Sequence, residues 1–247
     1  MKVMQLLNIS KTFGIGLDKR TLFSGVTVTF EQGKTYALQG ASGCGKSTFL
    51  HMLAGLDSPT TGAIIVDGKN VSDYVATKRA QSIVLVTQTP FFIKELSVIE
   101  NVALAALLID HTKAYAKELS EWYLEMVGLI EMKEWNIGKL SGGQKQRAAL
   151  ARALVVKPHF LCADEVTGSL DETTGQHIID LLLYLQKNEK MGVIISSHNP
   201  VVAAQMDLVF TIKDGILVPN YQSSNLEGIY DRSHAEKKHY KKDIASR

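Results

Sequence analysis

The segment from residue 40 to residue 48 restricts the possible folds of this chain more than any other. It reads GASGCGKST and fits the pattern G-x-x-x-x-G-K-[ST] of phosphate-binding loops. An expected strand, residues 35–39, precedes it, and an apolar stripe at helical spacing follows it as far as Gly55. This order of strand, glycine-rich turn and helix favours a phosphate-binding loop over an ordinary glycine-rich turn, and it predicts an α/β fold.

The chemistry of the segment suits a nucleoside triphosphate with Mg²⁺. Glycines allow the backbone to turn so that successive amides point at one anion, and a helix that starts here directs its positive end at the phosphates. We expect Lys46 near the β- and γ-phosphates and the Ser47 hydroxyl on Mg²⁺, which prefers hard oxygen ligands. The expected nucleotide contacts in this segment are Gly40, Ser42, Gly43, Cys44, Gly45, Lys46, Ser47 and Thr48.

Length and composition set limits on the class of protein. The chain has 247 residues, of which 45% are hydrophobic and 21% charged, so it can bury a globular core. Its net charge of +2 is too small to indicate a nucleic-acid partner. The longest apolar run, residues 102–109, is far too short to span a membrane, and residues 1–5 show no secretory signal. With two well-separated cysteines, Cys44 and Cys162, we expect no disulfide and a reducing cytoplasm.

The order of apolar patterns predicts one domain with an insert. A β-rich start is expected to form an antiparallel sheet, with strands at 3–9, 26–30 and 63–66 and a loop at 14–20. Residues 89–139 carry two helical patterns, 98–109 and 113–127, and read as a helical insert after a strand at 83–86. Alternating helices and strands then return, at 145–155, 160–163, 173–187, 193–197, 208–212 and 216–218, the last two as a hairpin.

The domain is expected to cover residues 1–218 and a polar tail residues 219–247. Within 231–247, six lysines and arginines stand against three acids, a local charge of +3. We interpret the tail as frayed or weakly helical, and contact with an anionic bilayer or a partner is the alternative.

Two carboxylates follow an apolar strand at residues 160–163. Ligand sites of open α/β sheets lie at the carboxyl ends of the strands, so Asp164 and Glu165 are placed where a nucleotide would bind. We expect Asp164 to hold Mg²⁺ through water and Glu165 to orient or deprotonate the attacking water. The alternative, that two acids merely end a buried strand, is disfavoured by the free-energy cost of buried carboxylates.

The sequence Leu140-Ser141-Gly142-Gly143-Gln144 precedes a predicted helix. A serine and two glycines at a helix start form an anion site, whereas a plain N-cap would need only one such residue. Beside a phosphate-binding loop, this run is a specific signal.

With these motifs in this order, the sequence resembles the ATP-binding cassette (ABC) ATPases over residues 1–218. The resemblance implies that residues 40–48 are the Walker A loop, residues 160–164 Walker B, and residues 140–144 the signature motif. It implies a P-loop ATPase of ABC type, with a β-rich N-terminal subdomain, a parallel-sheet core and an inserted helical subdomain. It also assigns roles to individual residues: Glu165 as catalytic carboxylate, Gln88 as the Q-loop glutamine, His198 as the switch histidine, Asp171 in the D-loop, Phe13 against adenine, and Ser141, Gly142, Gly143 and Gln144 at the nucleotide of a second copy.

Three of these residues have a plainer interpretation when taken alone. Gln88 could be a solvated polar residue, but at the entry to the insert it could touch Mg²⁺ or the attacking water and link the nucleotide to the insert. His198 could be structural instead of contacting the γ-phosphate. Phe13 could be ordinary edge packing.

The chain departs from the common family pattern at three positions. Ala41 and Val166 replace usual prolines, and Phe13 replaces a usual tyrosine. None removes a catalytic group, so we expect an active ATPase. Val166 lies between the catalytic carboxylate and the D-loop, so it raises a question about the loop geometry.

The resemblance also implies partners. Two copies are expected to bind two ATP molecules head to tail, with Lys46 of one copy and Ser141 of the other on the same γ-phosphate. Separate membrane permease subunits are expected to dock near the insert, where Pro90, Phe91 and Phe92 mark either a docking groove or ordinary insert core. The chain would then lie on the cytoplasmic face of the membrane through these subunits.

Residues 42–61 resemble the branch of lipoprotein-release, macrolide-export and antimicrobial-peptide-resistance ATPases. The predicted function is therefore ATP hydrolysis that drives export or mechanotransmission. An importer ATPase and a soluble ABC ATPase in translation or DNA repair are the alternatives, and a nucleotide kinase would not explain residues 141–144 or His198.

Overall fold

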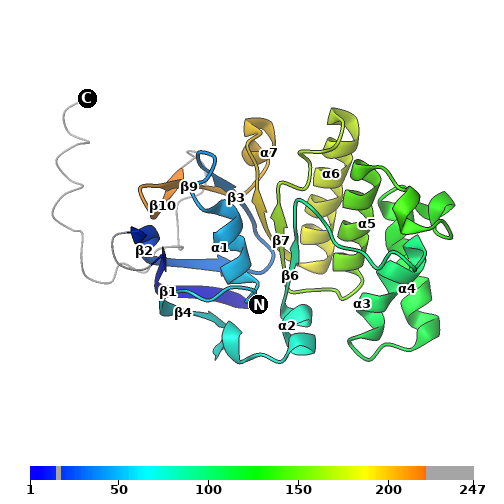
Figure 1. Ribbon diagram of the computed structural model, residues 1–247, viewed down its shortest axis with the longest axis horizontal. Coiled ribbons are helices and arrows are strands. Elements are labelled where there is room, and N and C mark those ends of the chain that lie inside the picture. The colour runs from blue at the N-terminus through cyan, green and yellow to red at the C-terminus, as the bar shows by residue number, and fades with distance from the viewer. Residues whose placement is uncertain (15–17, 221–247) are drawn as a thin grey trace.

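A computed structural model describes residues 1–14 and 18–220. It contains two sheets and two groups of helices (Figure 1). Most of the proposed polar tail, residues 221–247, lies outside the described residues. No helix in the described part of the chain is long and apolar enough to cross a membrane.

The first sheet is antiparallel, as the sequence predicted, and has the strand order β2-β1-β4-β5. Its strands are β1 (Val3–Phe13), β2 (Arg20–Glu31), β4 (Thr61–Val66) and β5 (Lys69–Asn70). The predictions for β1 and β2 were too short, and the predicted loop at 14–20 was wrong at its end because β2 already begins at Arg20. The register between these strands shifts near Asn8 and Gly25, and such bulges interrupt the alternation of apolar residues from which the strands were predicted.

The second sheet has the order β10-β9-β3-β8-β7-β6 and is parallel except for the β9–β10 hairpin. Its strands are β3 (Thr35–Gln39), β6 (Ile83–Val86), β7 (Phe160–Asp164), β8 (Gly192–Ser196), β9 (Leu208–Lys213) and β10 (Ile216–Asn220). Because β3, β6, β7 and β8 run in one direction, their carboxyl ends meet at one edge of the sheet. The predicted hairpin and the predicted strands after residue 80 are confirmed within one or two residues.

Alternate side chains of the parallel strands face two different cores. Phe160, Cys162 and Ile194 pack with α1 (Lys46–Leu53) and the antiparallel sheet, whereas Leu161 and Val193 face the helical side. Figure 1 shows α1 on one side of the sheet and α5 (Gly142–Leu154) and α6 (Glu172–Glu189) on the other. The sheet therefore separates the helix that follows the phosphate-binding loop from the helix that follows the signature motif.

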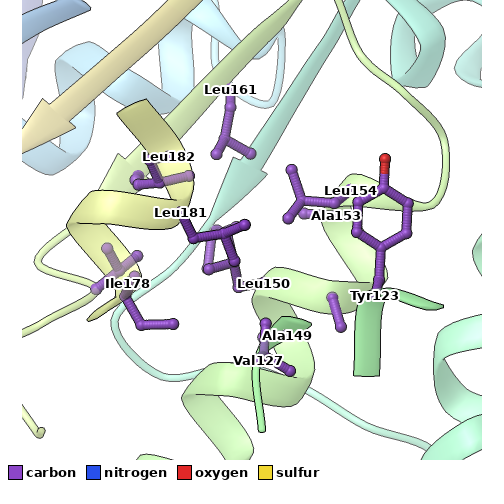
Figure 2. Close-up of a cluster of buried hydrophobic side chains, with 14 of the residues drawn as sticks. Tyr123, Val127, Ala149, Leu150, Ala153, Leu154, Leu161, Ile178, Leu181 and Leu182 are labelled. Carbon is purple, nitrogen blue, oxygen red and sulfur yellow. The ribbon is translucent and has the colours of Figure 1, made fainter. Parts of the chain in front are cut away.

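The helical side is extended by the segment that the sequence predicted as an insert. It holds α3 (Val98–Leu107) and α4 (Lys113–Met126), which agree with the two helical patterns. Figure 2 shows Tyr123 and Val127 at the end of α4 packed toward α5, and α5 toward Leu161 of β7 and toward α6. The sequence did not predict α2 (Ala76–Ser82), and α7 (Pro200–Ala204) follows β8.

Candidate functional site

The predicted phosphate-binding loop connects β3 to α1 at the carboxyl edge of the parallel sheet. Two of its glycines have no substitute. A Cβ at Gly40 (φ 148°) would lie 2.6 Å from Cys44 Sγ, and a Cβ at Gly45 (φ 106°) would lie 2.8 Å from Phe23 Cζ. Gly45 is also the N-cap of α1 and supplies no side-chain cap, so the first amides of that helix remain directed into the loop.

Lys46 is almost completely buried and lies on this loop. Its Nζ is 3.0 Å from Gly40 O, 3.4 Å from Ala41 O and 3.1 Å from His198 Nε2. A buried ammonium group is costly unless it is hydrogen-bonded, and these contacts satisfy it without a ligand.

Glu165 contacts the two other residues that the sequence predicted as catalytic, Gln88 and His198. Its Oε1 is 2.9 Å from His198 Nε2, and its Oε2 accepts a hydrogen bond of 3.2 Å from Gln88 Nε2. One ring nitrogen of His198 therefore lies between Lys46 and Glu165, and it can donate to Glu165 or accept from Lys46 but not both at once. The structure thus brings together Lys46, Gln88, Glu165 and His198, which are widely separated in the sequence.

The oxygen donors predicted for Mg²⁺ suit that ion. Ser47, Gln88 and Asp164 offer a hydroxyl, an amide oxygen and a carboxylate, which are hard ligands. In the described residues no group of three or more His, Cys, Asp and Glu side chains is arranged to hold a metal by itself. This donor set is what Mg²⁺ requires when nucleotide phosphates and water supply the remaining ligands.

The aromatic platform predicted at Phe13 lies at the end of β1 and is 45% exposed. Lys11 Nζ lies 4.8 Å from the centre of its ring, and the same ammonium group donates to Asp57 Oδ1 at 2.6 Å and Ser58 O at 2.8 Å. Burial raises the pKa of Asp57, but the hydrogen bonds and charge of Lys11 outweigh it, so the pKa lies below its usual value. Across the strand pair, Arg20 lies opposite Phe13 and donates to Gly43 O at 3.3 Å. Phe13 is therefore anchored beside the phosphate-binding loop.

The predicted signature segment forms a local structure of its own. Ser141 Oγ accepts from the Gln144 amide at 3.3 Å, and Gln144 Oε1 accepts from the Ser141 amide at 2.8 Å, which is a capping box at the start of α5. Ser141 and Gly142 are exposed, and a Cβ at Gly142 would meet no atom within 4 Å. Among the residues that the structure describes, no hydrogen bond joins this segment to the phosphate-binding loop of the same chain.

Asp171 lies near the signature segment. It caps α6 by accepting from the Thr174 amide at 2.9 Å, a hydrogen bond that lowers the pKa of its carboxyl. A Cβ at Gly143 would lie 2.9 Å from Leu170 Cδ2, so residues 169–171 pack against the start of α5. The two segments predicted to face a second copy are therefore neighbours in this chain.

Sequence reasoning missed two sets of residues at the site. Lys11 and Asp57 are 46 positions apart in the sequence, and only the fold brings them together as an ion pair. Ser196, two residues before His198, is a polar residue at the end of an otherwise apolar strand, and that contrast was the available signal.

Comparisons with known proteins agree with these features. Residues 23–168 match the family model described as ABC transporter. The lipoprotein-releasing system ATP-binding protein LolD of Myxococcus xanthus is 39% identical, covering 83% of this chain and 94% of the relative, and LolD of Syntrophus aciditrophicus is 36% identical, covering 87% and 99%. A dimeric, post-hydrolysis structure of the ATP-binding cassette MJ0796 with ADP and Pi superposes with a TM-score of 0.81 and 30% identity, over 87% of this chain and 96% of that one.

Proposed function

The chain belongs to the ABC transporter family, as an ATP-hydrolysing subunit, and we propose that it drives conformational change in separate membrane subunits of a lipoprotein-release or related mechanotransmission system. The branch predicted from residues 42–61 is the one to which both named relatives belong. The observation that carries the proposal is the convergence of Lys46, Gln88, Glu165 and His198 beside a phosphate-binding loop. The comparisons give no better support to an importer or a soluble ABC ATPase.

The proposed roles follow from position and chemistry. The amides of residues 40–48 and the Lys46 ammonium group bind the phosphates, and Phe13 stacks on adenine. Ser47, Gln88 and Asp164 would hold Mg²⁺, which would offset phosphate charge. Glu165 orients or deprotonates the attacking water, and His198 contacts the γ-phosphate.

The second half of each site is proposed to come from another copy. The N-terminus of α5 and the exposed Ser141 suit an anion that the same chain does not supply. In the capping box the Ser141 hydroxyl accepts a hydrogen bond, so its own proton is available to donate to a γ-phosphate. Asp171, beside this segment, would face the same junction. Two copies arranged head to tail would then enclose two ATP molecules, and hydrolysis would loosen them.

A groove on the helical side is the proposed docking site for a helical segment of the membrane subunit. It has a volume of about 400 Å³ and lies between α2, β6, α3 and α5, with a mainly apolar lining that includes Ala80, Val84, Val86, Ala105, Ala149 and Ala153. Pro90 lines this groove, and the next residue, Phe91, is 88% exposed. An exposed aromatic group beside an apolar groove marks an interaction site.

Phe92 behaves differently from Phe91. It is partly buried against the core, and the Arg152 guanidinium lies 4.5 Å from the centre of its ring while donating to Phe91 O at 2.6 Å. Both earlier interpretations of residues 90–92 are thus supported, one for each phenylalanine. Through these contacts the chain would lie on the inner face of the membrane.

The proposal is tested by capture from detergent-solubilised membranes with tagged Glu165→Gln protein and Mg-ATP, followed by mass spectrometry. We expect a membrane permease, whose architecture would distinguish release or export from import. Recovery of ribosomal or DNA-bound proteins alone would instead support a soluble ABC ATPase. A Phe91→Asp change in the same background should lose the permease, whereas Ile216→Asp, at an exposed apolar position on β10, should not.

A further inference from the structure

Ser196 ends β8, the central strand beside β7. The strand is buried along its whole length, and its residues Gly192, Val193, Ile194 and Ile195 carry no polar side chain. Ser196 has no exposed surface and lies opposite Asp164 in the parallel pairing of β7 with β8. A hydroxyl in such a position needs hydrogen-bond partners, because an unpaired buried polar group costs free energy.

Both partners of this hydroxyl belong to the two acidic residues of the proposed site, Asp164 and Glu165. Ser196 Oγ lies 2.6 Å from Asp164 Oδ1 and 3.1 Å from the Glu165 amide, which is also 3.2 Å from the Ser196 carbonyl oxygen. A carboxylate only accepts and an amide N–H only donates, so the directions are set: Glu165 N–H donates to the hydroxyl, and the hydroxyl donates to Asp164. Hydrogen bonds in such a chain strengthen one another, and the one to the carboxylate is charge-assisted.

The backbone that this hydroxyl holds is in a costly conformation. Glu165 has φ 49°, in the left-handed region that is unfavourable for a residue with a Cβ. The turn closes through a hydrogen bond of 3.0 Å from the Gly168 amide to the Glu165 carbonyl oxygen. Val166 follows Glu165 and has no ring to restrict φ, and its side chain is buried in the core of the helical side.

We propose that Ser196 is a positioning residue for ATP hydrolysis, whose hydroxyl couples the Asp164 carboxylate to the backbone of Glu165. The inference rests on the roles proposed above for these two acids. Through one hydroxyl, the orientation of the Mg²⁺ ligand and the direction of the Glu165 side chain become dependent on each other.

An apolar residue in place of Ser196 would remove the two hydrogen bonds of the hydroxyl. Asp164 is almost fully buried, so its Oδ1 would lose a partner inside the protein, and the Glu165 amide would keep only the 3.2 Å bond to the backbone. Phe13 and Lys46, which are proposed to bind adenine and the phosphates, make none of their hydrogen bonds or ring contacts with Ser196. The expected defect is therefore in Mg²⁺ use and turnover, not in nucleotide affinity.

The test compares Ser196→Ala and Ser196→Thr with the matched control Ser120→Ala. Ser120 is equally buried, but its hydroxyl donates at 2.6 Å to the Ala116 carbonyl oxygen within α4, remote from the site. For Ser196→Ala we expect kcat to fall by about tenfold or more and the Mg²⁺ concentration for half-maximal turnover to rise by about tenfold, because hydrogen bonds to a metal ligand carry effects of this size. KM for ATP should stay within about twofold of the unsubstituted protein. Ser196→Thr should restore both values, and Ser120→Ala should change neither.

A second readout does not depend on turnover. In the Glu165→Gln background, ATP-driven association followed by gel filtration should need about tenfold more Mg²⁺ with Ser196→Ala, while binding of ATP in EDTA stays the same. If Ser196→Ala proves too unstable, Ser196→Cys keeps the size with a weak donor and should give an intermediate Mg²⁺ requirement.

The outcomes separate this inference from the proposed function. If the unsubstituted protein turned over no more ATP than the Glu165→Gln protein, the proposed function itself would be wrong. An active protein in which Ser196→Ala loses only as much thermal stability as Ser120→Ala, with kcat and Mg²⁺ requirement unchanged, would overturn the role of Ser196.

Discussion

The phosphate-binding loop and the signature segment are built in opposite ways. Around the loop, Lys46, Glu165 and His198 are contributed by different elements, and His198 Nε2 lies within hydrogen-bonding distance of the other two. The signature segment is exposed, and Ser141 and Gln144 bond to each other within four residues. The first half requires the whole sheet to form it, whereas the second needs only the start of α5. The difference teaches how the proposed shared site would be assembled: the fold would organise one half, and the other half would be rigid locally and open to a neighbouring copy.

The largest expected effect on ATP turnover comes from substituting the phosphate-binding loop in one copy and the signature segment in the other. Lys46→Ala and Ser141→Arg should each lower turnover by about 100-fold or more, because each removes a contact with the transferred phosphate. Equal mixing of the two inactive proteins should restore about a quarter of the unsubstituted activity, since half of the random dimers contain one intact site of two. ATPase assays of the mixture measure this.

A matched mixture sharpens that comparison. Lys46→Ala mixed with Glu165→Gln places both changes in the same half, so every dimer lacks an intact site and activity should stay low. Recovery in this control, or none in the first mixture, would contradict the head-to-tail arrangement.

The next effect concerns the helical side, which carries the signature segment. Asn101 is buried and makes four hydrogen bonds, to both backbone groups of Ile93 and to the carbonyl oxygens of Leu96 and Ser97. Asn101→Ala should lower the free energy of unfolding by about 2–4 kcal/mol, because several buried groups lose their partner. Denaturant titration measures the loss. Asn136→Ala, which loses two exposed hydrogen bonds, one to the Lys94 carbonyl oxygen and one from the Gly138 amide, should cost less, about 1 kcal/mol.

A smaller effect is expected at the adenine platform. Lys11→Met removes the cation beside Phe13, so ATP affinity should fall by about two- to fivefold, as expected for a cation–π contact, while pyrophosphate binding stays constant. Equal weakening of ATP and pyrophosphate binding would mean that Lys11 acts on the phosphate-binding loop instead.

The same substitution has a pH signature. The depressed pKa of Asp57 contributes stability above the pKa of the unfolded chain, and this stability is lost as pH falls through the folded value. The Lys11→Met protein should therefore be less stable than the unsubstituted protein at neutral pH, and the difference in stability between the two proteins should shrink as the pH falls. Thermal unfolding between neutral and acidic pH measures both.

The smallest effect compares two buried tyrosines. Among the residues described by the structure, the Tyr123 hydroxyl on the helical side has no hydrogen-bond partner, and burial raises the pKa of this phenol. The Tyr36 hydroxyl, on the sheet side, accepts from the Glu31 amide at 2.7 Å. Tyr123→Phe should be neutral or stabilising by about 0.5–1 kcal/mol, whereas Tyr36→Phe should cost about 1 kcal/mol. Melting curves with equal losses for both would contradict this difference.

Local patterns predicted the parts of the fold that have local causes. The glycines and Lys46 of the loop, the apolar strand before Asp164 and the two insert helices are all visible in short windows of sequence. Helix α2 was missed because ATKRAQS has no apolar stripe, and β2 was predicted too short because a bulge breaks its alternation.

The residues of the site were predicted in part. The motifs pointed to Lys46, Asp164 and Glu165 directly, whereas Gln88 and His198 depended on a family resemblance. Their specific catalytic roles remain predictions. The contacts of Ser196 with Asp164 and of Lys11 with Asp57 could not be predicted, since these partners lie 30 to 50 positions apart and only the strand pairing brings them together.

The hydrogen bonds of Lys46 have a consequence for which anions can bind beside it. A single orthophosphate, sulfate or carboxylate at this ammonium group would compete with two backbone carbonyl oxygens and His198, and it would offer only one charge centre in return. In the proposed function, a nucleotide would also bring further phosphates to the loop amides and a base to Phe13. We therefore expect the surroundings of Lys46 to favour polyphosphates over small anions.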